Sequence, residues 1–114
     1  MEIKAATGDI TKFKAGAIMV NHFEGVKSPE GDAAAADKAL GGAISNLIKQ
    51  GDIKGKLNEI NVLHSLGKLP AGRIVVVGLG KKKELTVNKV RGALAEACRY
   101  LRGKGVTDIA TVTQ

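Results

Sequence analysis

The sequence is poor in the residues that mark several common classes of protein. Its 114 residues include one cysteine, two prolines, two phenylalanines, one tyrosine and no tryptophan. The single cysteine, Cys98, permits neither an intramolecular disulfide nor a cysteine-based zinc site, and its helical surroundings predict a buried thiol. So few aromatic rings leave almost no platform on which the bases of single-stranded nucleic acid could stack.

Long apolar runs are missing as well. No stretch approaches the roughly 20 apolar residues that cross a bilayer, and residues 1–4 lack the apolar core of a secretory signal. We therefore expect a cytoplasmic protein with no membrane partner. Positive charge is abundant instead: 18 lysines and arginines against 11 acidic residues give a net charge of +7, which leaves contact with a duplex backbone open.

The apolar pattern predicts strands at 2–6, 17–20, 59–63, 73–77 and 106–113. The run at 73–77 is apolar throughout, as expected of a central strand buried on both faces. A helix is expected from Ala33 to about Gln50, capped by Asp32 and ended by Gly51, with close backbone contact at 41–42. A second helix follows Thr86, and the residues expected on its buried face are Val87, Val90, Leu94, Ala97 and Leu101.

This order of elements predicts one α/β domain, 1–114, with a mixed central sheet. The chain stops directly after the last expected strand, without a helix to cover the remaining sheet face. That abrupt end predicts a chain truncated at its C-terminus.

None of the residues that could carry chemistry forms a complete site. Gly78-Leu79-Gly80 follows a strand, as in a dinucleotide-binding loop, but the third glycine position holds Lys83, so a connecting turn is expected. His22 and His64 are too few for a zinc site, and no serine lies in a nucleophile elbow. We therefore expect neither a catalytic residue nor a metal ligand in this chain.

Four short motifs occur in order along the chain: Gly-Ala-Ile-Ser at 42–45, Gly-Asp-Ile-Lys-Gly-Lys at 51–56, Arg-Ile-Val-Val-Val-Gly-Leu-Gly at 73–80 and Arg-Gly-Ala at 91–93. Together they resemble the N-terminal domain of the leucyl aminopeptidases, or cytosol aminopeptidases, over residues 17–114. Ile53 stands where phenylalanine is commoner in that family, and we expect it to pack rather than react.

The resemblance implies a three-layer, macro-domain-like fold in which helices flank the mixed sheet. It also implies a parent hydrolase whose C-terminal domain binds two divalent metal ions, zinc or manganese, that activate water. The Asn-Thr-Asp-Ala-Glu-Gly-Arg motif of that domain is absent here, so no catalytic residue carries over and no cofactor is expected in this chain. The implied partners are the parent's own catalytic domain and the other subunits of a homo-hexamer, with roles in assembly and substrate access.

Some bacterial members of the family also bind DNA, and the net charge makes that role an open expectation. The cations expected to contact a duplex backbone are Lys81, Lys82, Lys83, Lys89, Arg99 and Arg102.

An alternative function comes from the first part of the chain. Thr-Gly-Asp-Ile-Thr at 7–11, followed by 17–21, resembles the opening of macro domains that bind ADP-ribose. That resemblance would place Asp9 on the adenine and Asn21 near the distal ribose. However, the loop 22–29 lacks the glycine-rich phosphate loop, and Glu24 would repel phosphate, so Asp9 is expected to cap a turn instead.

Overall fold

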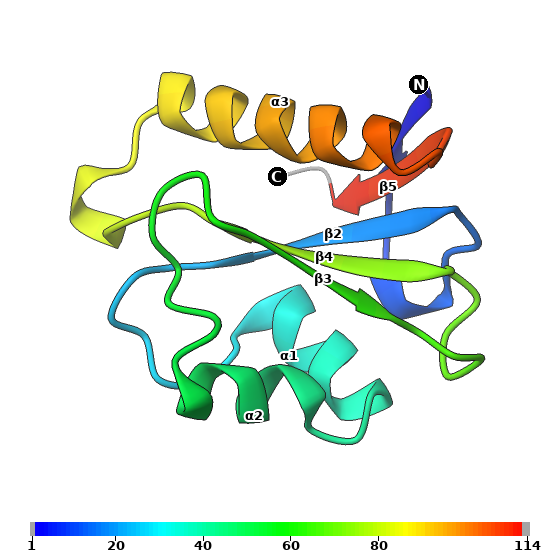
Figure 1. Ribbon diagram of the computed structural model, residues 1–114, viewed down its shortest axis with the longest axis horizontal. Coiled ribbons are helices and arrows are strands. Elements are labelled where there is room, and N and C mark those ends of the chain that lie inside the picture. Colours follow the sequence, from blue (N-terminus) through cyan, green and yellow to red (C-terminus); the bar gives the residue numbers. More distant parts are fainter. Residues whose placement is uncertain (1, 113–114) are drawn as a thin grey trace.

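A five-stranded mixed sheet forms the middle layer of the protein (Figure 1). The computed structural model describes residues 2–112, so the last predicted strand residue, Thr113, lies outside the described residues. The strands are β1 (Glu2–Ala6), β2 (Ala17–His22), β3 (Ile60–His64), β4 (Arg73–Gly78) and β5 (Asp108–Val112). Their spatial order is β1-β5-β2-β4-β3, with every neighbouring pair parallel except β3 and β4. All five predicted strands are present, most with bounds shifted by one or two residues, and the mixed sheet is confirmed.

Helices cover both faces of this sheet, which confirms the three layers (Figure 1). On one face lie α1 (Gly31–Ala39) and α2 (Ala43–Gln50), and on the other lies α3 (Val87–Gly103). Two short 3-10 helices, η1 (Ile10–Lys12) and η2 (Lys82–Glu84), lead into β2 and α3. None of the helices in the described part of the chain has the length and apolarity that crossing a bilayer requires.

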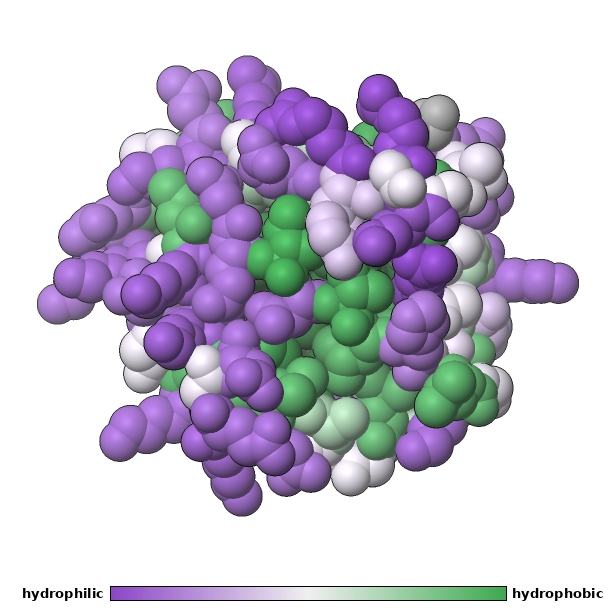
Figure 2. Space-filling model, viewed as in Figure 1, coloured by the Kyte–Doolittle hydropathy of each residue, from purple (hydrophilic) through white to green (hydrophobic). Residues whose placement is uncertain are grey.

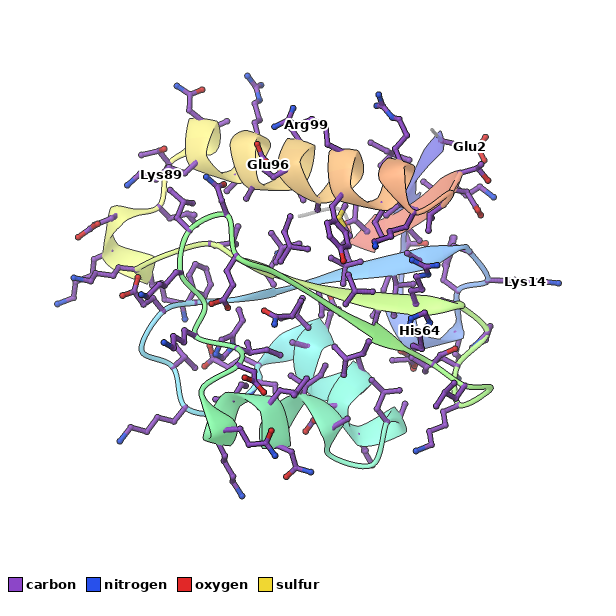
Figure 3. All side chains as sticks on the ribbon, in the orientation of Figure 1. Glu2, Lys14, His64, Lys89, Glu96 and Arg99 are labelled. Carbon is purple, nitrogen blue, oxygen red and sulfur yellow. The ribbon has the colours of Figure 1, made fainter. Side chains whose placement is uncertain are left out.

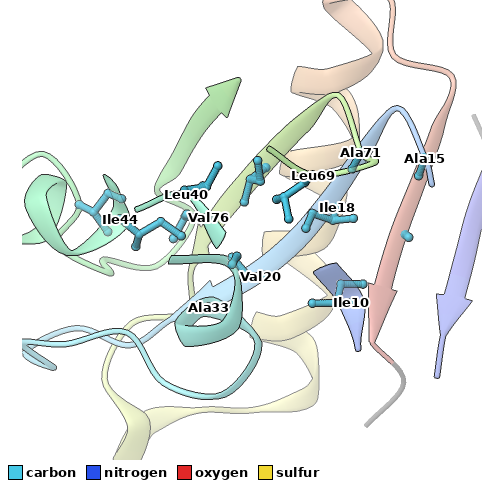
Figure 4. Packing of buried hydrophobic residues seen from close by; sticks show 14 residues of the cluster. Ile10, Ala15, Ile18, Val20, Ala33, Leu40, Ile44, Leu69, Ala71 and Val76 are labelled. Carbon is cyan, nitrogen blue, oxygen red and sulfur yellow. The ribbon is translucent and has the colours of Figure 1, made fainter. Parts of the chain in front are cut away.

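The central strands send alternate side chains into two separate cores, because successive strand residues point to opposite faces. Ile18, Val20 and Val76 pack toward α1 and α2 (Figure 4). Met19 and Val77 pack toward α3, in the same cluster as Cys98. The strand at 73–77 is therefore buried on both faces, as its continuous apolar run predicts.

Two further side-chain predictions are confirmed. The Cys98 thiol is buried in the α3-side core, and burial raises its pKa, while Arg102 and Arg99 nearby act in the opposite direction. Ile53 is 1% exposed and packs with the α1 and α2 cluster rather than facing a reactive site.

The edge strand β3 is less enclosed than the strands beside it. Residues 60–63 are half-buried, and their outer backbone edge has no neighbouring strand in the described sheet. Figure 2 shows hydrophobic atoms in the middle of this face of the molecule, where β3 lies in Figure 1, with hydrophilic atoms around them. Apolar side chains at this edge are thus partly open to solvent.

The single helix predicted over 33–50 is wrong, because the chain breaks into α1 and α2 at Gly41 and Gly42. Both glycines have left-handed backbones, with φ of 68° and 89°, which residues with a Cβ rarely adopt. A Cβ at either position would meet nothing within 4 Å, so the predicted close contact is also wrong. The glycines are needed for their backbone conformation.

The caps of these helices differ from the prediction as well. Glu30, rather than Asp32, occupies the N-cap position of α1, and its side chain makes no capping bond. The start of α2 is capped from α1 instead: the Asp37 carboxylate accepts hydrogen bonds from the Ser45 N–H at 2.8 Å and from its hydroxyl at 2.6 Å. Gly51 ends α2 in a left-handed conformation, as predicted.

In α3 the predicted cap is confirmed, since the Thr86 hydroxyl accepts a hydrogen bond from the Lys89 N–H at 3.2 Å. Val87 is wrongly predicted as buried: its exposed fraction is 68%, because the inward stripe only begins with Val90 one turn later. The last strand starts at Asp108 rather than at Val106, whose N–H still bonds to the helix end.

Candidate functional site

Three loops meet at the carboxyl ends of β2 and β4. We call this contact, formed by residues 22–24, 54–56 and 78–80, the loop junction. The Glu24 N–H donates to the Gly80 carbonyl at 2.9 Å, and the Gly80 N–H donates to the Gly55 carbonyl at 2.9 Å. The Glu59 carboxylate fixes the middle loop by accepting from the N–H groups of Lys54 and Gly55. Backbone hydrogen bonds thus tie together segments that lie far apart in the sequence.

Glycines make this junction possible because the backbones approach too closely for side chains. A Cβ at Gly78 would lie 2.0 Å from the Lys56 carbonyl oxygen. A Cβ at Gly55 would lie 2.5 Å from the Phe23 carbonyl carbon, and Gly55 also has a φ of 78°. The space beside Gly78 is filled by the protein's own backbone, so the close packing of the loops accounts for this glycine.

A cavity of about 580 Å³ lies next to the loop junction, over the carboxyl ends of β2 and β5. Residues of β2 and the first turn of α1 form part of its wall, and η2 and α3 form another part. Met19 and Leu94 supply apolar surface, while Asn21 and Asp32 supply polar groups. The carboxyl ends of parallel strands are the usual place for ligands in open α/β sheets, so this cavity is the candidate site.

Charged and aromatic side chains connect two walls of the cavity. The Lys82 ammonium lies 3.6 Å from the Glu30 carboxylate and 5.2 Å from the centre of the Phe23 ring. Both charged side chains are more than half exposed, so their ion pair adds little stability. Inside, His22 is buried and its Nε2 lies 2.9 Å from the Val26 carbonyl oxygen, to which it can donate.

The structure separates the two residues expected to hold ADP-ribose. Asn21 is part of the cavity wall, whereas Asp9 is not among the residues that line it in the described chain. The Asp9 carboxylate accepts hydrogen bonds from the Thr11 hydroxyl at 2.6 Å and from its N–H at 3.0 Å, which lower its pKa. Asp9 therefore caps η1, as expected for a turn residue.

The six cations expected at a DNA backbone lie on the η2 loop and along α3. Lys81, Lys83 and Arg102 are exposed. The others already have partners: Lys82 pairs with Glu30, the Lys89 ammonium donates to the Glu84 carbonyl at 2.9 Å, and Arg99 pairs with Glu96. Figure 3 shows Lys89, Glu96 and Arg99 along α3, so acidic side chains lie among these cations.

The sequence analysis did not identify a second group of lysines. It surrounds a hollow of about 550 Å³ beside the end of α2, and its members are Lys27, Lys49, Lys54 and Lys56. The lysines at 49, 54 and 56 follow one another closely along the chain, which is a weak signal. Lys27 joins them only through the fold. In residues 2–112, no group of three or more His, Cys, Asp and Glu side chains is placed to hold a metal ion.

Solved structures with the same fold fall into two groups. A mutant of tomato leucine aminopeptidase superposes with a TM-score of 0.74 at 19% identity, over 97% of this chain and 22% of that one. The macrodomain of Mycobacterium tuberculosis DarG superposes with a TM-score of 0.72 at 16% identity, over 96% of this chain and 74% of that one. At these identities the comparisons establish the macro-domain-like fold alone.

Sequence comparisons separate the two groups. A probable cytosol aminopeptidase of Geobacter sulfurreducens is 39% identical over 112 residues, which cover 98% of this chain and 23% of the relative. A probable cytosol aminopeptidase of Glaesserella parasuis is 31% identical over 95% of this chain and 22% of its own length. The chain thus spans about a quarter of the length of these relatives. The family described as "Cytosol aminopeptidase family, N-terminal domain" matches residues 19–114, and this chain belongs to that family.

Proposed function

We propose that this chain is the non-catalytic N-terminal domain of a cytosolic metallo-aminopeptidase, which releases N-terminal residues such as leucine from peptides. The proposal rests on the structural role of the glycines in the family's motifs. Gly55, Gly78 and Gly80 lie in the loop junction, where their backbones contact other backbones. Residues that hold loops together give a domain a fixed shape and leave the chemistry to another part of the parent.

The parent would bind two divalent metal ions, zinc or manganese, in its C-terminal catalytic domain. There the ions would supply the activated water for hydrolysis. The N-terminal domain would contact that catalytic domain and neighbouring subunits of a cytoplasmic homo-hexamer, and so contribute to assembly and substrate access. The length of the relatives supports this division, since this chain corresponds to 23% of the Geobacter sulfurreducens protein.

Hydrolysis of leucine amide tests the division of labour. The purified 114-residue chain should release no ammonia in the presence of zinc or manganese, whereas the full-length parent should be active under the same conditions. A second preparation, purified by a different route, controls for contaminating proteases. Turnover that follows the 114-residue chain through both preparations would contradict the proposal.

ADP-ribose binding is the second candidate, favoured by the macro-domain-like fold and by Asn21 in the cavity wall. Glu30 and Asp32 also line the cavity, and their carboxylates would repel a diphosphate. Calorimetric titration with ADP-ribose decides between the readings. Micromolar affinity that disappears in Asn21→Ala would establish the macro-type function, and the absence of measurable heat would reject it.

Duplex DNA is the third candidate ligand of the same domain. Support comes from the exposed cations Lys81, Lys83 and Arg102, although the Arg99–Glu96 ion pair on α3 weakens the positive potential that a phosphate backbone would meet. The proposal predicts an affinity that falls steeply as salt increases, and falls further in Lys81→Ala/Lys83→Ala. Affinity without salt dependence would reject contact through phosphates.

A further inference from the structure

The hollow beside the end of α2 is formed by two segments that the fold brings together. Residues 24–27, just after β2, form one side, and residues 48–56, at the end of α2 and in the loop beyond it, form the other. Figure 1 shows these segments next to each other at the left end of α2. The hollow shares no lining residue with the cavity over β2 and β5, so the two are separate places on the surface.

Apolar side chains make up part of the hollow's wall. Ile53 is fully buried there, whereas Val26 and Ile48 are half-buried and remain partly open to solvent. A ligand that covered Val26 and Ile48 with an apolar group would remove this surface from water. The hollow therefore favours a ligand with at least one apolar side chain.

Around these apolar residues stand Lys27, Lys49, Lys54 and Lys56, all exposed. None of the ion pairs within residues 2–112 involves these four lysines. Four lysines and one glutamate, Glu24, give the lining a net charge of +3. Unlike Arg99, which pairs with Glu96 on α3, these lysines form no ion pair in the described chain that an anionic ligand would have to displace.

The backbone under the lysines is held in place. The Glu59 carboxylate accepts hydrogen bonds from the N–H groups of Lys54 and Gly55 at 2.8 Å and 2.9 Å. The Gly55 carbonyl in turn accepts from Gly80 in the loop junction. The attachment points of Lys54 and Lys56 are thus fixed before any ligand binds, which reduces the ordering cost of binding to the side chains themselves.

We propose that this hollow is a docking site for an acidic peptide segment. One apolar side chain of the segment would cover Val26 and Ile48, and its flanking carboxylates would pair with the surrounding lysines. A peptide supplies carboxylates and an apolar group at the spacing of neighbouring residues. A nucleic acid fits less well, because its phosphates gain nothing from the apolar wall and the lining offers no aromatic ring to a base. This docking proposal is independent of the aminopeptidase activity proposed for the parent protein.

Binding is tested by fluorescence anisotropy with the 114-residue chain and a labelled, end-blocked peptide of sequence Glu-Glu-Leu-Leu-Glu-Glu. The charge reversal Lys27→Glu/Lys54→Glu should weaken binding about tenfold or more, because it opposes the peptide's carboxylates in the wall itself. The matched control is Lys14→Glu/Lys68→Glu, which changes the net charge equally. Figure 3 shows Lys14 at the far side of the molecule, and this pair should keep affinity within about twofold.

A second peptide tests the apolar contact without altering the protein. Replacing both leucines by serine should weaken binding about fivefold or more, since the apolar contribution is lost while the charge is kept. Equal affinity for the two peptides would overturn the proposal, and so would an equal loss in both charge-reversal pairs. Duplex DNA that binds more tightly than the leucine peptide, and loses affinity in Lys27→Glu/Lys54→Glu, would also overturn it in favour of a phosphate site.

Discussion

Glycine occupies a crowded position in the loop junction and an open position on the outer surface of α3. At Gly78 a side chain would collide with the Lys56 carbonyl, whereas a Cβ at Gly92, in the middle of α3, would meet nothing within 4 Å. Both positions belong to motifs that resemble the aminopeptidase family. The comparison shows that motif membership alone does not identify a required glycine, while the space around its missing Cβ does.

The largest effect on stability is expected for Gly78→Ala. The added Cβ would lie 2.0 Å from a backbone oxygen, so either β4 or the loop at 54–56 must move. We expect a loss of about 3 kcal/mol or more in the free energy of unfolding, at or above the usual range for overpacking. Urea unfolding measures it. A loss below about 1 kcal/mol would show that the junction yields easily.

The carboxylates show a similar contrast, because Asp37 is half-buried whereas Asp9 is exposed. Asp37→Ala removes the acceptor for the N–H and hydroxyl of Ser45 and leaves the start of α2 uncapped. We expect a loss of about 1–2 kcal/mol, as for other helix caps. Ser45→Ala is the matched control, because it removes only the hydroxyl bond and should cost less. Equal losses in the two variants would assign the effect to the hydroxyl alone.

Gly92→Ala makes the same chemical change as Gly78→Ala, but at a position where the added Cβ has free space. Alanine has the higher helix propensity and meets no neighbour here, so the variant should gain about 0.5–1 kcal/mol. Thermal unfolding should show a higher midpoint. A destabilised Gly92→Ala would mean that this face of α3 is covered in solution.

The smallest expected effect concerns Asp9, whose carboxyl is fully exposed. Hydrogen bonds from the Thr11 side chain and backbone hold the pKa of Asp9 below its ordinary value of 3.8. This bonding stabilises the fold above pH 3.8, and the contribution is lost as the pH falls through the lowered pKa. In Thr11→Val the pKa should move back toward 3.8, as NMR titration of the Asp9 carboxyl can follow. An unchanged midpoint would leave the hydroxyl without a role.

Local patterns were enough to predict much of the fold. Alternation and apolar runs located the strands, and Thr86 located the start of α3. The break at Gly41 and Gly42 was missed because the apolar stripe continues across it at helical spacing, and only the backbone angles reveal the interruption. The cap from Asp37 was missed since it joins two helices that were expected to be one.

The candidate sites were harder to predict because each depends on segments that meet only in the folded chain. Asn21 was expected near the distal ribose of ADP-ribose, and it does line the cavity. Asp9, its expected partner, is not among the lining residues and caps η1 instead, which only the folded chain reveals. The hollow beside α2 went unnoticed, since Lys27 lies more than twenty residues from the other lysines along the chain.

Two consecutive residues line different hollows of the molecule. Phe23 lines the cavity over β2 and β5, whereas the next residue, Glu24, lines the hollow beside α2. A ligand that displaced Phe23 in the cavity would also move Glu24 in the hollow, and the reverse holds for a ligand in the hollow. Occupancy of the two would then be thermodynamically linked, and by reciprocity each guest would change the other's affinity by the same factor.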